Sequence, residues 1–273
     1  MPSIGWALVA LALLLTGGAA YLLWGNATFE AAITADIAAV RGEATDPIAP
    51  PDLPEIVSAY ARRAGGVPGS SRAIRLEHRA ELTVERGRPP IRIRAEQWLS
   101  PHGSAMAWVG RGSMSGIPVT VIDSFVGGRG RLEARLVGTL QVAGGSGPDF
   151  DRGELQRYLS ELPVHPDAIL GNSALQWRQL DASTVEVTGQ SQGGPASVEF
   201  TFDAAGDIVA MRAADRPMAV DGTTVPTEWR GTYSDYREIG GYRIPLHGEV
   251  GWQLADGLFT YWRGDIVAYD AGR

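Results

Sequence analysis

The 273-residue chain contains no cysteine, and this absence removes several classes of protein at once. Disulfide frameworks and thiolate metal sites both require cysteine. The acyl anchor of a bacterial lipoprotein is also attached through a cysteine, so this chain cannot be held to a membrane in that way. Its four histidines form no H-E-x-x-H pattern, and no carboxylate-rich calcium loop occurs. We therefore expect neither a metal ion nor a cofactor.

The chain also lacks clusters of positive charge. Lys and Arg number 24 against 31 Asp and Glu, which gives a net charge of −7. Nucleic-acid binding requires clustered basic residues, so we expect no nucleic-acid partner. The glycine-rich loop at residues 127–130 lacks the phosphate-binding G-x-x-x-x-G-K-[ST] pattern, and the serines at 112–116 lack nucleophile-elbow spacing. Both segments are interpreted as turns between strands.

Charge is absent from residues 4–24, a mostly apolar run of 21 residues. As a helix it would be about 30 Å long, the thickness of a bilayer's hydrocarbon core. Trp6, Tyr21 and Trp24 lie near its two ends, where aromatic rings favour the membrane interface. The sequence therefore predicts a transmembrane anchor at residues 1–26, with the following domain outside the cytoplasm. A cleaved signal peptide, cut after Ala20 or Ala27, is the alternative.

Residues 27–69 are predicted to join the anchor to the main domain. Phe29, Ile33, Ile37 and Val40 recur at helical spacing, which indicates an amphipathic juxtamembrane helix. A proline-rich linker at residues 47–54 would end it, and a short helix over 55–64 would follow.

Residues 70–273 are predicted to form an antiparallel β-rich domain. Residues 74–84 alternate between apolar and charged, the period of a strand with one buried face. Further strands are predicted at the following ranges: 91–95, 105–110, 119–125, 131–142, 174–180, 184–189, 197–203, 208–213, 227–239, 242–254 and 258–269. The fold class is therefore mainly β (α+β): an N-terminal transmembrane helix, then a large curved antiparallel sheet or unclosed barrel with covering helices.

One helix interrupts the strands near residues 151–170. Asp151 is expected to cap it, with Glu154 completing a capping box. The apolar residues of this helix repeat at i, i+3, i+4 and i+7, which predicts one face packed against the sheet: Leu155, Tyr158, Leu159 and Leu162.

Large aromatic side chains are spread over many of the predicted strands. They provide apolar surface with single polar atoms, which suits a groove for an acyl chain as well as a filled core. The candidate groove residues are His78, Trp98, Trp108, Tyr158, Trp177, Trp229 and Trp252. His247 and Glu249 share one strand face, so they also provide a candidate acid–base pair for a hydrolase.

Several segments together resemble an uncharacterised bacterial family of membrane-anchored proteins, a domain of unknown function. They are residues 123–130, 156–163, 166–170, Trp177 with Asp181, 240–245, and Trp252 with 256–257. The body also resembles the periplasmic lipoprotein-carrier (LolA/LolB-like) superfamily, which implies an unclosed antiparallel barrel whose apolar concave face is covered by helices. The first resemblance implies a membrane-anchored bacterial protein. Because the large polar domain follows the span, we expect a single-pass protein of the bacterial inner membrane with its soluble domain on the periplasmic side.

These observations lead to three functional hypotheses. The first is a membrane-tethered, non-catalytic protein that binds a lipid or acyl chain between sheet and helices. The second is a structural or envelope-assembly module that binds a protein partner, whose identity the sequence does not indicate. The third is a hydrolase that uses His247 and Glu249.

Overall fold

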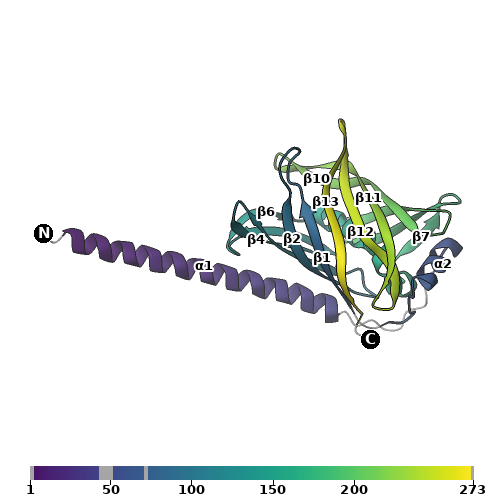
Figure 1. Cartoon of the computed structure of the whole chain (residues 1–273), viewed down its shortest axis with the longest axis horizontal. Coiled ribbons are helices and arrows are strands. Elements are labelled where there is room, and N and C mark those ends of the chain that lie inside the picture. Colours follow the sequence, from purple (N-terminus) through teal and green to yellow (C-terminus); the bar gives the residue numbers. More distant parts are fainter. Residues whose placement is uncertain (1–2, 43–51, 71–72, 272–273) are drawn as a thin grey trace.

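The computed structural model describes residues 3–42, 52–70 and 73–271, and its strands form one 13-stranded antiparallel sheet (Figure 1). The strand order is β6-β5-β4-β3-β2-β1-β13-β12-β11-β10-β9-β8-β7. The strands are β1 (Ile74–Leu82), β2 (Ile91–Leu99), β3 (Met106–Met114), β4 (Ile117–Val126), β5 (Arg129–Leu136), β6 (Leu140–Ser146), β7 (Gln176–Gln179), β8 (Thr184–Ser191), β9 (Gly194–Phe202), β10 (Ile208–Val220), β11 (Thr223–Ile239), β12 (Tyr242–Leu254) and β13 (Gly257–Asp270).

The sheet consists of two consecutive meanders joined in its middle. Strands β1–β6 form the first and β7–β13 the second, and β1 pairs with β13 to unite them. The two edges are therefore β6 and β7, which are consecutive in sequence. The connection between them contains the helix α3 (Pro148–Ser160), the 3₁₀ turn η1 (Leu162–Val164) and α4 (Pro166–Gly171). This segment crosses the concave side, so the predicted curved sheet with covering helices is confirmed.

The N-terminal helix α1 (Ser3–Gly42) continues without a break through residue 26, where the anchor was predicted to end. It contains the one helix in the described part of the chain that is long and apolar enough to cross a membrane. Side chains from Gly5 to Trp24 are exposed, and this half projects away from the sheet (Figure 1). Most of the proline-rich linker lies outside the described residues. The short helix after it is α2 (Glu55–Arg63).

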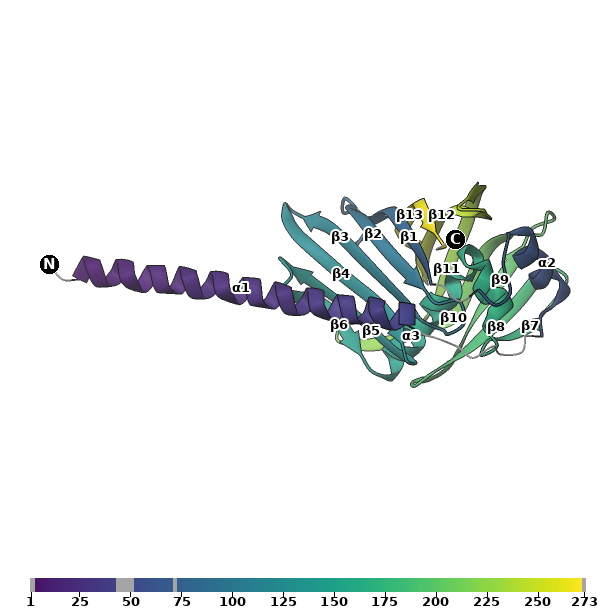
Figure 2. The ribbon, with the colours of Figure 1, turned by 90° about the horizontal axis from the view of Figure 1, so that it is seen from below.

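The second half of α1 packs on the convex face of the sheet (Figure 2). Phe29, Ile33 and Val40 are buried there against small residues of β3. Asp36 accepts hydrogen bonds from the hydroxyl of Ser124 and the guanidinium of Arg131. The described part of the predicted amphipathic juxtamembrane segment therefore packs directly on the sheet.

Alternation in β1 follows the sequence pattern. Ile74, Leu76, His78 and Ala80 are buried on the concave face, while the arginines and glutamates between them point outward. Ion pairs on the outer face join neighbouring strands, as between Arg75 of β1 and Glu96 of β2. The buried side chains of β1 therefore mark the concave face of the sheet.

The start of α3 differs from the prediction. Gly147 is the N-cap and Pro148 is the first helical residue, so Asp151 lies one turn inside the helix. Its carboxylate instead accepts the backbone N–H of Gly130, 2.8 Å away, and ties the helix to β5. A side chain at position 130 would collide with the Phe150 carbonyl, so only glycine allows this approach.

Residues 131–142, predicted as one strand, form a hairpin. The chain turns at Val137 and Gly138, whose φ angles are 45° and 69°, and β6 returns beside β5. Valine is rarely found with positive φ, which is why the sequence did not indicate a turn here. A second unpredicted hairpin joins β10 to β11 through Asp221 and Gly222.

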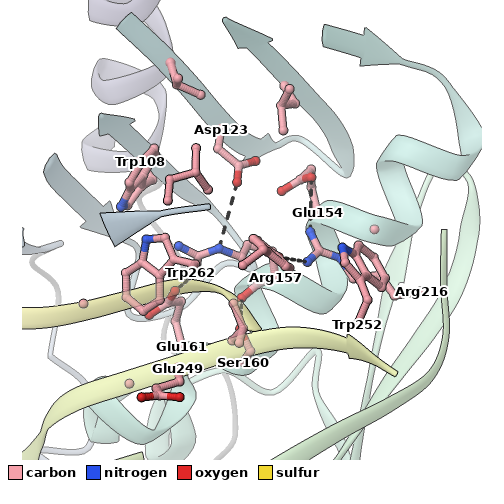
Figure 3. Close-up of a pocket in the computed structure, with 18 of the residues that line it drawn as sticks. Trp108, Asp123, Glu154, Arg157, Ser160, Glu161, Arg216, Glu249, Trp252 and Trp262 are labelled. Carbon is pink, nitrogen blue, oxygen red and sulfur yellow. Dashed lines mark hydrogen bonds and ion pairs between the residues drawn. The ribbon is translucent and has the colours of Figure 1, made fainter. Parts of the chain in front are cut away.

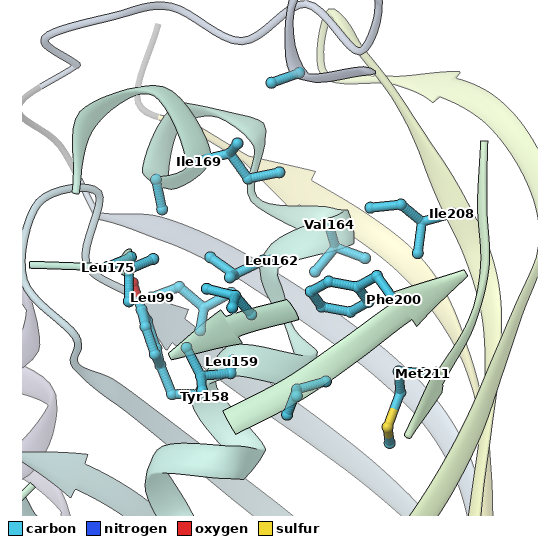
Figure 4. Packing of buried hydrophobic residues seen from close by; sticks show 14 of the residues in the cluster. Leu99, Tyr158, Leu159, Leu162, Val164, Ile169, Leu175, Phe200, Ile208 and Met211 are labelled. Carbon is cyan, nitrogen blue, oxygen red and sulfur yellow. The ribbon is translucent and has the colours of Figure 1, made fainter. Parts of the chain in front are cut away.

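The main core lies where the helical connection meets the sheet (Figure 4). Leu159, Leu162 and Val164 pack against side chains of the second meander such as Phe200. Three tyrosine hydroxyls also donate to backbone carbonyls in residues 160–164, which a helix end leaves without intrahelical partners. The pairs are Tyr60 to Pro163, Tyr233 to Ser160 and Tyr269 to Val164.

Candidate functional site

A cavity of about 450 Å³ separates α3 from the concave face of the sheet (Figure 3). This volume lies in the range of small-molecule binding pockets, roughly 300–1,000 Å³. One face of α3 forms one wall, and strands of both meanders form the others. The core of the domain is therefore not filled throughout. One side of α3 packs tightly in the main core, and the other side borders the cavity.

Three indole rings form much of the apolar wall. Trp108 and Trp262 lie flat along the sheet, each across the glycine two residues further on. A Cβ at Gly110 would collide with the ring of Trp108, and one at Gly264 with that of Trp262. The glycines therefore let the rings lie against the backbone instead of filling the cavity.

The third indole continues this wall beside other apolar groups. Trp252 stacks on Tyr261, with ring centroids 5.9 Å apart. Aliphatic side chains complete the surface: Leu82, Val121, Leu132, Val164, Leu246, Val250 and Ile266. Most of the cavity surface is thus suited to a hydrocarbon ligand.

The inner end of the cavity is ionic. From α3, Glu154 lies 3.5 Å from Arg216 of β10, and Arg157 lies 3.9 Å from Asp123 of β4. Arg157 also forms an ion pair with Glu161, one turn further along the helix. Figure 3 shows these side chains converging between the strands and α3. Two arginines and three carboxyl groups thus share a largely dehydrated site.

Burial raises the pKa of Glu154 well above its usual value, and the nearby negative charge of Asp123 raises it further. Arg216 and Arg157 act in the opposite direction but do not outweigh these effects. Glu154 therefore holds its proton more readily than an exposed glutamate does.

Several polar atoms that line the cavity have no hydrogen-bond partner among the described residues. They are the Nε of Arg216, the Nε1 atoms of Trp108 and Trp262, one oxygen each of Asp123 and Glu154, and both ring nitrogens of His78. Unpaired buried polar atoms are costly, about 1–3 kcal/mol each. The residues around the inner cavity therefore carry buried donors and acceptors that have no partner among the described residues.

His78 lies on β1 beside this group, with its ring edge toward Trp262 at 6.3 Å between centroids. Burial lowers its pKa to about 4, and the positive charge of Arg157 adds to the effect. The imidazole is thus neutral near pH 7. A neutral imidazole has one donor and one acceptor nitrogen.

The seven candidate groove residues fall into two groups. His78, Trp108 and Trp252 line the cavity. Trp229 lies just behind it, with its ring centroid 4.1 Å from the Arg216 guanidinium carbon, and its indole N–H donates to Tyr261.

The other candidate residues lie elsewhere. Tyr158 is buried in the core, where its hydroxyl accepts from Asn172, and Trp177 stacks on Phe200 beyond α3. Trp98 points to the convex face and packs against the cluster under α1, so its assignment to the groove is wrong.

His247 and Glu249 come together as their spacing predicted, with 3.5 Å between Nε2 and Oε1. Both residues belong to the stretch of β12 that borders the cavity, but they pair with Asp265 and Arg263 of β13, which lie on the outward parity of the sheet. Figure 3 shows Glu249 across its strand from Arg157. His247 also pairs with Asp265 at 2.7 Å, and Glu249 with Arg263 at 3.1 Å. Partial burial lowers the pKa of His247, but its two acidic partners outweigh this and raise it. The pair forms part of a surface ionic network.

The ionic group at the inner end was not among the predicted site residues. Its one sequence signal was Asp123, a charged residue at an inward position of a strand between Val121 and Phe125. The residues on α3 gave no signal, because Glu154, Arg157 and Glu161 look like the solvent face of an amphipathic helix. In the described part of the chain, no group of three His, Asp or Glu residues is arranged to hold a metal ion.

Similar solved structures include a LolA superfamily protein from Nitrosomonas europaea, at 10% identity and TM-score 0.42, covering 78% of this chain and 92% of that one. A putative outer membrane lipoprotein-sorting protein domain from Vibrio parahaemolyticus is 7% identical, with TM-score 0.41 and coverage of 79% and 90%. A DUF1329 family protein from Desulfovibrio piger has 11% identity, TM-score 0.30 and coverage of 83% and 93%.

A search of curated protein sequences finds no match. The sequence resemblance to a domain of unknown function is confirmed by a family model. That model, the family of unknown function DUF6544, matches residues 44–264. The match spans most of the chain, which therefore belongs to the DUF6544 family.

Proposed function

We propose that this protein binds a hydrophobic ligand with a polar end, such as an acyl lipid, in the cavity between α3 and the sheet. The observation that carries the proposal is the open cavity of about 450 Å³, apolar along its walls and ionic at its inner end. An apolar pocket with a few convergent polar groups is the usual form of a small-ligand site.

The arrangement of the walls supports an elongated, amphipathic ligand. A hydrocarbon chain would lie along the indoles and aliphatic side chains, where burial contributes about 25 cal/mol per Å² of apolar surface. The polar end would reach Arg216, whose Nε is unpaired, and the acid of Glu154. Because Arg216 is a charged donor, a carboxylate or phosphate would give the stronger hydrogen bonds.

The location proposed for this binding is a bacterial inner membrane, with the domain on the periplasmic side. The exposed apolar half of α1 supports a membrane anchor, and its docked half would hold the cavity at a fixed place relative to the bilayer. The protein would take up or present its ligand at the membrane surface without catalysing a reaction.

Photocrosslinking of the full-length protein in membranes tests this proposal. Diazirine-labelled fatty acid and diazirine-labelled phospholipid are supplied separately, and the crosslinked peptides are mapped by mass spectrometry. We expect label on cavity residues of β12 and β13, such as Val250 and Trp262, in addition to α1. The more efficient of the two probes identifies the head group as carboxylate or phosphate. Label confined to α1 with either probe would refute the proposal.

Two alternative functions have less structural support. A purely structural module would have a filled core, whereas this domain retains a large cavity. A hydrolase using His247 and Glu249 would need these groups in a site that excludes water, but both side chains are about a third exposed and are already paired with Asp265 and Arg263.

A further inference from the structure

Two hairpins beside the exposed half of α1 have uncharged tips. They are the β3–β4 hairpin, within an uncharged run at residues 112–122, and the β5–β6 hairpin, within one at 136–146. Their tips expose five large apolar side chains: Met114, Ile117, Val137, Leu140 and Val142, of which Leu140 is 61% exposed. Edge strands such as β6 are normally protected by charge, so an exposed uncharged edge indicates a contact surface.

The turns at the opposite ends of these strands have a different character. They connect β2 to β3 and β4 to β5, and no large apolar side chain is exposed in residues 100–105 or 127–128. Within the described part of the first meander, exposed apolar tips are therefore concentrated at the end from which the apolar half of α1 projects (Figure 2).

The depth of these tips along α1 is fixed by direct contact. The hydroxyl of Thr139, in the β5–β6 turn, donates to the backbone carbonyl of Leu22 at 2.8 Å. Tyr21 and Trp24 lie on either side of Leu22, are exposed, and pack on each other at 6.5 Å between centroids. Aromatic residues at the end of an apolar span mark the membrane–water interface, so this turn lies at interfacial depth.

Val137 adds an independent observation. The structure contains comparable two-residue turns at Ser115-Gly116, Gly127-Gly128, Asp221-Gly222 and Gly240-Gly241, all with positive φ at both positions. Their first residues are the small or polar types that tolerate this conformation. Valine at φ 45° is unfavourable, and an apolar side chain kept at a strained position indicates a role for that side chain.

We propose that the β3–β4 and β5–β6 hairpins insert their apolar tips into the interface of the bilayer that holds α1. This inference rests on the membrane anchor of the proposed function. Its occupant is the lipid surface itself, because the contact between Thr139 and Leu22 makes the tips continuous with the end of the span. The domain then has two attachments to the bilayer, the helix and the hairpin tips, and cannot rotate freely about its tether.

The absence of native cysteine makes depth measurement direct. Single cysteines replace Leu140, Met114, Leu15 and Leu180 in the full-length protein, which is labelled with an environment-sensitive fluorophore and reconstituted in phosphatidylcholine vesicles containing nitroxide lipid. Leu15→Cys reports on the span. Leu180→Cys, in the β7–β8 turn, is the matched control, exposed but distant from α1.

We expect nitroxide lipids to quench labels at Leu140→Cys and Met114→Cys several-fold more strongly than a label at Leu180→Cys. The depth measured for these two labels should be shallower than that for Leu15→Cys. Quenching of Leu15→Cys alone would refute hairpin insertion and leave the anchor intact. If Leu15→Cys is also unquenched, both the anchor and the inference fail. Protection of Leu140→Cys from aqueous quencher without lipid quenching would show a protein covering β6, which also overturns the inference.

Discussion

Arg216 of β10 and Glu154 of α3 approach within 3.5 Å at the inner end of the cavity, and less than a tenth of either side chain is exposed. Arg216 also lies over Trp229, and its Nη1 contacts the Tyr261 hydroxyl at 3.4 Å. The arginine is thus held by Glu154, by the indole of Trp229 and by the Tyr261 hydroxyl, while its Nε has no hydrogen-bond partner among the described residues. This arrangement leaves its charge available to a ligand while connecting α3 to the second meander.

Replacing this arginine should weaken both stability and ligand binding. Arg216→Met keeps much of the apolar stem but removes the charge and the contact with Trp229. A desolvated cation–π contact and a broken buried pair together lead us to expect a loss of about 2–4 kcal/mol in the free energy of unfolding. Denaturant unfolding measures it, and crosslinking with the diazirine probes measures the loss of ligand.

Arg212→Met on the same strand is the matched control. Arg212 forms surface ion pairs with Glu228 and Glu199, which contribute roughly 0–1 kcal/mol. Equal losses for the two variants would contradict the special role assigned to Arg216.

The cavity depends on glycines that let two indoles lie flat. Gly264→Val should force the ring of Trp262 away from the sheet and into the cavity, because the new side chain would occupy the ring's position. We expect a several-fold decrease in lipid crosslinked to β12 and β13, together with a destabilisation of about 1–3 kcal/mol from overpacking.

Gly248→Ala provides the comparison, since a Cβ there meets ordinary contacts at 3.7 Å. It should retain most of the crosslinking. An undiminished lipid yield in Gly264→Val would show that the ligand does not occupy this cavity.

The buried His78 should make its own contribution to stability fall as the pH decreases from about 6.5 toward 4. Its pKa of about 4 in the folded protein lies below the ordinary 6.5, so in this window the unfolded chain binds more protons than the folded one. The difference between the folded and unfolded pKa values of His78 corresponds to roughly 3 kcal/mol in the free energy of unfolding. Unfolding free energies of wild type and His78→Leu at pH 7 and pH 4 measure this contribution, and the variant should show the smaller change.

The contribution of His247 to stability should change with pH in the opposite direction to that of His78. Its pKa is raised in the folded protein, so its contribution is present below pH 6.5 and is lost as the pH rises through the raised value. His247→Gln should therefore remove stability at low pH only. A pH dependence unchanged in both variants would contradict these assignments.

The regular alternation of apolar and polar residues within the strands made much of the fold predictable. The parity of β1 identified the concave face, and glycine pairs such as Gly240-Gly241 marked turns. The β5–β6 hairpin was missed because the local signal for its turn is absent, with valine where asparagine or glycine is usual.

The site was less predictable, because it depends on where α3 lies. A charged stripe on a helix normally faces water, and Glu154 and Arg157 fit that pattern. Here the helix lies inside a curved sheet, so its polar face is enclosed as well as its apolar one. Only the three-dimensional path from one sheet edge to the other brings this stripe to Asp123 and Arg216.

The strained turn at Val137 provides a test that separates folding from membrane contact. Val137→Asn creates the Asn-Gly sequence favoured in turns with two positive φ angles, so it should stabilise the isolated fold by roughly 0.5–1 kcal/mol. The same change places a polar amide at the hairpin tip and should weaken its insertion. Denaturant unfolding in detergent should show the gain, while nitroxide quenching at a neighbouring label, Leu140→Cys, should decrease in vesicles. A gain in stability with unchanged quenching would mean that Val137 does not contact lipid.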